Sequence, residues 1–180
     1  MSGPDERPTP DVVVEQDADR LARAAAEALV ARLAAAQALR GSASVVLTGG
    51  GIGTAVLEQM AALAAEPVRE RVDWTAVDVW WGDERFVPAD DDERNEKQAR
   101  RALLDAVGVP DDRVHAMPAS DGPFAEPEDA AEWYAGQLAS AAGGEDDGTP
   151  GNRPEYGPSH YSAFLRDPDG HRVEVVVSTD

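Results

Sequence analysis

Apolar residues recur at helical spacing through the first long stretch of the chain. Asp17 is well placed to cap the start of this predicted helix, and Gly41 to end it. Before the helix, Val12–Val14 is predicted as a short strand, and residues 1–10 as a disordered lead-in. The apolar positions that predict the helix are Leu21, Ala25, Ala28, Leu29, Leu33 and Ala36.

A glycine-rich turn joins the next predicted strand to the next predicted helix. Val45–Leu47 is a short apolar run, four glycines stand within positions 49–53, and a helical pattern then continues to about Ala65. Such a turn presents backbone N–H groups at the positive end of a helix, where they can bind the oxygens of an anion. The spacing is neither a dinucleotide fingerprint nor a nucleotide P-loop. The alternatives are therefore an anion site of another kind and a tight turn without a ligand.

Strands and helices alternate as far as residue 141, which predicts an α/β fold: a layered, mostly parallel sheet with flanking helices. In such a sheet, ligands bind beyond the carboxyl ends of the strands. The glycine turn and Gly82–Arg85 both follow predicted strands, so both are expected at that edge. The further predicted elements are a strand over Trp74–Trp81, a loop over Asp90–Glu93, a helix over Asn95–Val107, an extended piece over Val114–Met117 and a helix over Glu126–Ala141.

Charged side chains stand at the end of the Trp74–Trp81 strand. Arg85 can bind a phosphate through two parallel hydrogen bonds, while Asp83 and Glu84 can orient the guanidinium or bind hydroxyl groups. The alternative is an ion pair on the surface. Because two such loops are expected at one sheet edge, an anion site is the favoured interpretation.

The composition changes at Ala142. Residues 142–158 are rich in Gly, Asp and Pro and predict a linker. After it, His160–Arg166 and Arg172–Val177 alternate on either side of a strong turn sequence at 167–170, which predicts an antiparallel hairpin. The predicted division is a lead-in at 1–10, an α/β domain at 11–141, a linker at 142–158 and a hairpin tail at 159–180.

The charge of the chain limits its partners. The sequence holds 35 acidic and 16 basic residues, for a formal net charge of −19. Nucleic acid and membrane surfaces are therefore not expected partners, because phosphate contacts need clustered Lys and Arg. A small anion would have to be held locally by backbone N–H groups and a few arginines. The sequence has no cysteine, and no apolar run approaches the roughly 20 residues that span a bilayer, which fits a cytoplasmic protein.

The histidines offer little for catalysis or metal binding. His115 follows an apolar residue in a predicted strand and is interpreted as structural. His160 and His171 lie near opposite ends of the hairpin, where they can face each other or simply occupy strand positions. Glu174 could bind a metal, but one carboxylate and one histidine do not make a site. We expect neither a metal nor a cofactor.

Several spaced motifs between about residues 12 and 141 resemble the N-terminal part of the 6-phosphogluconolactonase family. The Gly-Asp-Glu-Arg run that continues to Val87 and Pro88 is the most specific of them. The related glucosamine-6-phosphate deaminases share the fold and the glycine loop but fit this run less well. The matching segments are Leu47–Gly51, Trp74, Val79–Pro88, Asn95 with the helix after it, and Ala116–Pro118.

The resemblance implies hydrolysis of 6-phospho-D-glucono-1,5-lactone in the pentose phosphate pathway, without a metal. It implies that the glycine loop and Arg85 hold the phosphate of this sugar-phosphate substrate. The residues carried over are Thr48, Gly49, Gly50, Gly51 and Arg85 for the phosphate, and Asp83, Glu84 and Asn95 for other substrate contacts.

The resemblance ends before the family's catalytic motif, Gly-x-Gly-Pro-Asp-Gly-His-x-x-Ser-Leu-Phe. Pro168–His171 matches four of its letters, but the flanking glycines and the Ser-Leu-Phe are absent. The general base for water attack is therefore not assigned to His171, and catalytic residues stay unknown. We expect a truncated domain with impaired turnover, and an open sheet that favours self-association. The alternative is a non-catalytic sugar-phosphate-binding protein.

The tail resembles a different family. Residues 156–174 are similar to the end of a glyoxalase/bleomycin-resistance (vicinal oxygen chelate) module, in which the residue matching Glu174 can bind a metal. The strands that carry the other ligands in that family have no counterpart here. A metal-dependent glyoxalase- or dioxygenase-like protein is therefore the third alternative.

Overall fold

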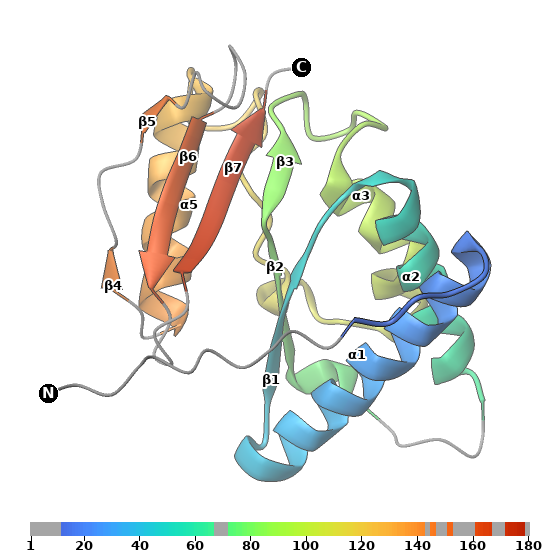
Figure 1. The fold of residues 1–180 in the computed structure, drawn as a ribbon. Coiled ribbons are helices and arrows are strands. Elements are labelled where there is room, and N and C mark those ends of the chain that lie inside the picture. The colour runs from blue at the N-terminus through green and yellow to red at the C-terminus, as the bar shows by residue number, and fades with distance from the viewer. Residues whose placement is uncertain are drawn as a thin grey trace, which may run out of the picture.

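The computed structural model describes residues 12–66 and 72–142, together with four strands beyond them. Figure 1 shows helices packed around twisted strands. Hydrogen bonding groups the described strands into a two-stranded sheet and a five-stranded sheet. The α-helices are α1 (Ala18–Arg40), α2 (Gly50–Ala64), α3 (Asn95–Ala99), α4 (Asp105–Val107) and α5 (Pro127–Ala142), and the other helical segments are η1 (Trp74–Ala76), η2 (Arg100–Leu104) and η3 (Asp111–Arg113). The strands are β1 (Ala43–Leu47), β2 (Val77–Trp81), β3 (Asp83–Arg85), β4 (Glu145–Asp146), β5 (Gly151–Asn152), β6 (Tyr161–Arg166) and β7 (Arg172–Ser178).

The first helix begins and ends where its sequence predicts. The Asp17 side chain accepts a hydrogen bond from the backbone N–H of Arg20 at 2.8 Å, which satisfies one of the free donors of the first turn. At the other end Gly41 adopts a left-handed conformation with φ of 80°, which a residue without Cβ adopts readily. The strand predicted over Val12–Val14 is wrong, because these valines form no strand and lie exposed. β-branched residues favour a strand only where a neighbouring strand pairs with them.

The predicted parallel pairing is confirmed in the pair β1 and β2. The two strands run in register from Ala43 beside Val77 to Leu47 beside Trp81. The strand predicted from Trp74 begins only at Val77, because Trp74–Ala76 forms a short helical turn capped by the Asp73 side chain. The extended piece predicted over Val114–Met117 contributes a single parallel bridge, from Val114 to Val79.

A second sheet includes a strand that the sequence did not predict. After Gly82 the chain continues as β3, which pairs in parallel with β7, with Glu84 beside Val177. The predicted hairpin is confirmed, since β6 pairs antiparallel along its whole length with residues 172–177 of β7. The short strands β4 and β5 fall within the segment predicted as a linker, and both pair with β6. The strands of the tail therefore form the second sheet together with β3 (Figure 1).

The helix predicted over Asn95–Val107 is confirmed as one continuous helical run of α3, η2 and α4, in which η2 is a wider π turn. Gly108, with φ of 72°, ends it. The helix predicted over Glu126–Ala141 is confirmed as α5. The largest fully buried side chains, which form the centre of the core, are Trp81, Tyr134, Met60, Leu103, Leu104, Val77 and Val79.

A buried hydroxyl ties α5 to the sheet. Tyr134 accepts a hydrogen bond from the backbone N–H of Trp81 and donates one to the carbonyl of His115, both at 2.8 Å. Burial raises the pKa of the Tyr134 phenol well above its ordinary value, so the group stays protonated and can serve both partners. These two hydrogen bonds fix the carboxyl end of β2, directly before Gly82 and β3.

Candidate functional site

The start of α2 presents backbone N–H groups that no acidic side chain caps. Gly49 is the N-cap residue and offers no side-chain acceptor, and the first turn of α2 holds no acidic residue. Gly50 has φ of 84°, a backbone conformation that glycine allows at little cost. Because the first N–H groups of a helix have no partner within the helix, those of α2 remain available to an external acceptor.

An open cleft brings this helix start together with Arg85 and Asn95. Of the residues that the sequence indicated, Gly50, Gly51, Arg85 and Asn95 all line it. Among the described residues, the Arg85 side chain makes no hydrogen bond or ion pair, so its guanidinium is free to bind an anion. The cleft is also lined by residues that were not predicted from the sequence: Thr54, Ala55, Glu58, Glu93 and Gln98.

Asn95 is fixed between the glycine turn and β3. Its side-chain Nδ2 donates to the carbonyl oxygen of Asp83 at 3.0 Å and lies 3.2 Å from the carboxylate Oδ2 of the same residue. On the other side it touches the backbone of Gly49 so closely that a Cβ added there would lie 1.9 Å from the Asn95 Oδ1. Gly49 therefore makes room for Asn95, and Asp83 orients it.

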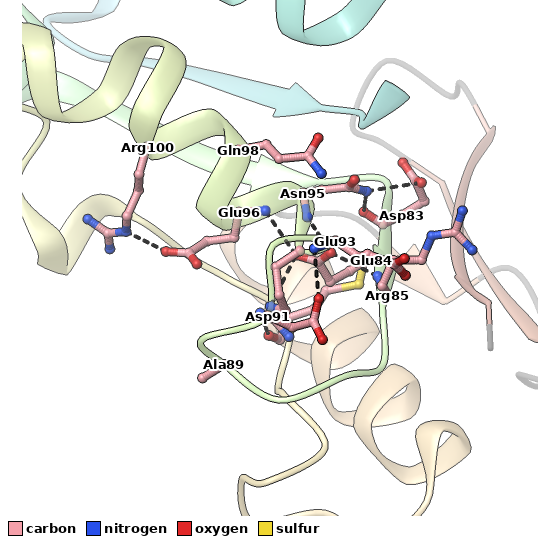
Figure 2. Close-up of polar contacts among 12 residues, drawn as sticks. Asp83, Glu84, Arg85, Ala89, Asp91, Glu93, Asn95, Glu96, Gln98 and Arg100 are labelled. Carbon is pink, nitrogen blue, oxygen red and sulfur yellow. Dashed lines mark hydrogen bonds and ion pairs between the residues drawn. The ribbon is translucent and has the colours of Figure 1, made fainter. Parts of the chain in front are cut away.

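Glu84 is buried beneath the cleft, with 2% of its surface exposed. Its Oε1 accepts from the backbone N–H groups of Arg85 at 2.8 Å and Asn95 at 2.7 Å, and its Oε2 accepts from that of Glu96 at 3.0 Å (Figure 2). The carboxylate thus caps the start of α3 and joins it to β3. It does not line the cleft.

A buried arginine accompanies this carboxylate. Arg94 is 3% exposed, its Nε lies 3.6 Å from Oε2 of Glu84, and its Nη2 donates to the Met117 carbonyl at 2.7 Å. Burial raises the pKa of Glu84, while the backbone N–H of Glu96 and the charge of Arg94 oppose that rise. The turn between β3 and α3 is thus built around a buried ion pair.

The remaining predicted residues lie at the edge of this arrangement. Thr48 does not line the cleft, but its carbonyl oxygen would lie 2.8 Å from a Cβ added at Gly53, so the fourth glycine is also needed for space. Asp83 acts on Asn95 and is not part of the lining. Helical spacing could have indicated the missed residues, since Thr54 and Glu58 are one turn apart on α2.

The described histidine is engaged elsewhere. His115 Nε2 lies 3.0 Å from Oδ1 of Asp78, and its ring stacks on Trp80 with centroids 4.0 Å apart. The part of the chain that the structure describes holds no group of three or more His, Cys, Asp or Glu that could bind a metal. His160, His171 and the side chain of Glu174 lie outside the described residues. None of the described helices is long and apolar enough to cross a membrane.

Comparison with known proteins identifies relatives of the α/β part. The glucosamine-6-phosphate isomerase/6-phosphogluconolactonase family matches residues 16–155. A 6-phosphogluconolactonase of Streptomyces coelicolor is 53% identical over 135 residues, which are 74% of this chain and 51% of that protein. A 6-phosphogluconolactonase of Mycobacterium tuberculosis is 48% identical over 134 residues, covering 74% of this chain and 52% of the relative.

Comparison with solved structures supports the same fold. The 6-phosphogluconolactonase of Trypanosoma brucei aligns with a TM-score of 0.59 and 29% identity, over 78% of this chain and 54% of that one. The enzyme of Thermotoga maritima aligns with a TM-score of 0.60 over 92% of this chain and 75% of that one, and at 20% identity it supports the fold alone. The chain spans about half the length of the curated relatives that it matches. The chain belongs to the glucosamine-6-phosphate isomerase/6-phosphogluconolactonase family.

Proposed function

We propose that this chain binds the phosphate of a 6-phosphosugar lactone at the cleft between α2 and α3, as a protein of the 6-phosphogluconolactonase type. The observation that carries the proposal is the convergence of two anion-binding features. The uncapped start of α2 and the guanidinium of Arg85, which makes no hydrogen bond or ion pair among the described residues, border one cleft that Asn95 also lines. Its curated relatives are 6-phosphogluconolactonases, which supports a sugar phosphate as the anion.

The cleft offers separate polar groups for the phosphate and for the hydroxyl groups of such a ligand. The N–H groups at Gly50 and Gly51 and the Arg85 guanidinium would hold the phosphate. Thr54, Glu58, Glu93 and Gln98 also face the cleft and could accept or donate hydrogen bonds to sugar hydroxyl groups. Since the net charge of the chain is −19, these local groups must overcome the overall field.

Hydrolysis requires a further group, because the water that attacks the lactone needs a general base. No histidine lines the cleft among the described residues, and the described His115 is engaged with Asp78 and Trp80. This observation favours the second candidate, a non-catalytic sugar-phosphate-binding protein. The proposed setting is the pentose phosphate pathway in the cytoplasm.

Separate assays of binding and turnover test these two candidates. We expect 6-phosphogluconate to bind the wild-type chain in calorimetry and the Arg85→Ala variant to bind it at least tenfold more weakly, since a charge-assisted hydrogen bond to phosphate is lost. Absence of binding by the wild type would overturn the proposal. Hydrolysis of 6-phosphogluconolactone that disappears in His171→Ala would instead assign the general base to that residue.

Two further proposals concern the tail and the sheet. A glyoxalase-like tail that binds a metal, the third alternative, predicts that the purified chain carries a divalent metal. A metal-free preparation in elemental analysis would count against it. Self-association through sheet edges predicts a mass above that of the monomer in light scattering, and a clean monomer would contradict it.

A further inference from the structure

We propose that Glu84 is the positioning residue of the anion cleft: its carboxylate sets Arg85 and Asn95 in place without touching the ligand. The inference rests on the proposed function, because it explains how that site is built. It starts from the position of Glu84 between the two residues that line the cleft from β3 and α3.

One oxygen of Glu84 serves both of these residues. Oε1 accepts from the backbone N–H of Arg85 at 2.8 Å and of Asn95 at 2.7 Å, although the two residues are ten positions apart in sequence. The distance between the backbones of Arg85 and Asn95 is thus governed by a single acceptor atom. A change in its position would move a cleft-lining residue on either element.

The second oxygen fixes the axis of α3. Oε2 accepts from the backbone N–H of Glu96 at 3.0 Å, so the carboxylate takes up two successive N–H groups of the first turn. Figure 2 shows these contacts converging on Glu84 at the start of the helix. Because Gln98 lies on the same turns and also lines the cleft, the orientation of α3 affects this residue as well.

The capping of α3 explains why its helix start is not a second anion site. Free N–H groups at the start of a helix attract an anion, and here a carboxylate of the protein already occupies that place. The start of α2 has no such acid. The chain therefore directs one helix start to an internal carboxylate and leaves the other for the ligand.

Arg94 favours the charged, accepting form of this carboxylate. Its Nε lies 3.6 Å from Oε2, and both side chains are almost fully buried. A carboxylate without that partner would be driven toward the protonated state by burial and would then lose acceptor capacity. The Met117 carbonyl, bound by Arg94 Nη2 at 2.7 Å, anchors the arginine from the other side.

Affinity for inorganic phosphate and for 6-phosphogluconate, measured by calorimetry on the full chain, tests the proposal. Glu84→Ala removes all three hydrogen bonds that this carboxylate accepts. It is expected to lower the affinity for both ligands about tenfold or more, since small misplacements of binding groups are costly. Glu84→Gln retains an amide oxygen in place of Oε1 and should recover part of the affinity. It also keeps the test open if Glu84→Ala does not fold.

Two control variants separate positioning from general destabilisation. Leu103→Ala opens the core at a residue that is 1% exposed and should lower the melting temperature while leaving the phosphate affinity of the folded protein unchanged. Glu96→Gln makes the same chemical change beside Glu84 on a side chain that pairs with Arg100, and should also leave affinity unchanged. Equal losses in Leu103→Ala and Glu84→Ala would overturn the proposal.

A double-mutant cycle identifies the route by which Glu84 acts. If Glu84 acts partly through Arg85, then Glu84→Ala should cost distinctly less phosphate affinity in an Arg85→Ala background than in the wild type. Fully additive losses would refute action through the guanidinium. The proposed function fails separately, by the absence of phosphate binding in the wild type, whereas wild-type affinity in Glu84→Ala would refute the positioning role alone.

Discussion

A methyl group on Gly49 would lie 1.9 Å from Oδ1 of Asn95, far inside any permitted contact. The glycine turn and the start of α3 therefore depend on each other: the turn can pass only because Gly49 has no Cβ, and Asn95 occupies the space that this leaves. The same asparagine is held from the other side by Asp83. The requirement for glycine at this position is thus steric and arises from a residue distant in sequence.

We predict that Gly49→Ala displaces Asn95 and breaks its hydrogen bonds to Asp83. Chemical denaturation should show a loss of about 1–3 kcal/mol in the free energy of unfolding, in the range for steric conflicts at packed sites. Affinity for phosphate should fall in the same variant. A variant as stable as the wild type would show that Asn95 can rearrange at no cost.

Gly136 provides the matched control for that substitution. It lies in α5, exposed, and a Cβ added there meets nothing within 4 Å. Gly136→Ala should therefore raise the free energy of unfolding by up to about 1 kcal/mol, because alanine favours the helix and restricts the unfolded chain. A loss of stability in this variant would indicate a contact that the helix face does not show.

The buried Tyr134 hydroxyl gives a third test. Tyr134→Phe leaves the Trp81 N–H and the His115 carbonyl without their partner inside the core. The expected cost is about 1–3 kcal/mol in the free energy of unfolding, the usual penalty for stranded buried polar groups. A melting temperature equal to that of the wild type would mean that other groups replace the hydroxyl.

The raised pKa of Glu84 predicts how stability depends on pH. Because the folded protein holds this proton more tightly than the unfolded chain, whose carboxyl has a pKa near 4.5, Glu84 favours folding most below pH 4.5. That contribution is lost as pH rises through the folded pKa. The glutamine variant has no such proton, so its stability relative to the wild type should increase from pH 4.5 to neutral pH.

Urea unfolding of both proteins across this pH range measures the difference directly. The comparison cancels the contribution of the other acidic residues, which both proteins share. A stability difference that stays constant with pH would show that Arg94 and the three N–H donors fully offset the burial of the charge.

The hydrophobic pattern was sufficient for the elements whose stabilising contacts are local. The capped helix from Ala18 to Arg40, the strand before the glycine turn and the helix after it follow from apolar spacing, an N-cap and glycines. The Val12–Val14 strand failed because pairing depends on a partner, not on propensity alone. β3 was missed for the same reason, since a strand of three residues is defined by its pairing with β7.

Part of the candidate site could also be predicted from the sequence, and part could not. Strand, glycines and helix in sequence indicate an anion site, and the run ending in Arg85 places a cation at the same edge, because the carboxyl ends of parallel strands meet there. The roles of Glu84 and Asn95 could not be assigned in this way. In the sequence both are polar residues near a turn, and only burial distinguishes a carboxylate that binds backbone N–H groups from one that faces a ligand.

The sequence by itself determined the class of the fold, the glycine turn between a strand and a helix, and the resemblance to the 6-phosphogluconolactonase family that the family comparison confirmed. These features depend on residues close together in the chain. The tertiary structure decided that Arg85 and Asn95 border one cleft, that Gly49 makes room for Asn95, and that the tail pairs with β3. Such facts depend on which distant backbones approach each other, and that is fixed by packing and hydrogen bonding between elements far apart in the sequence.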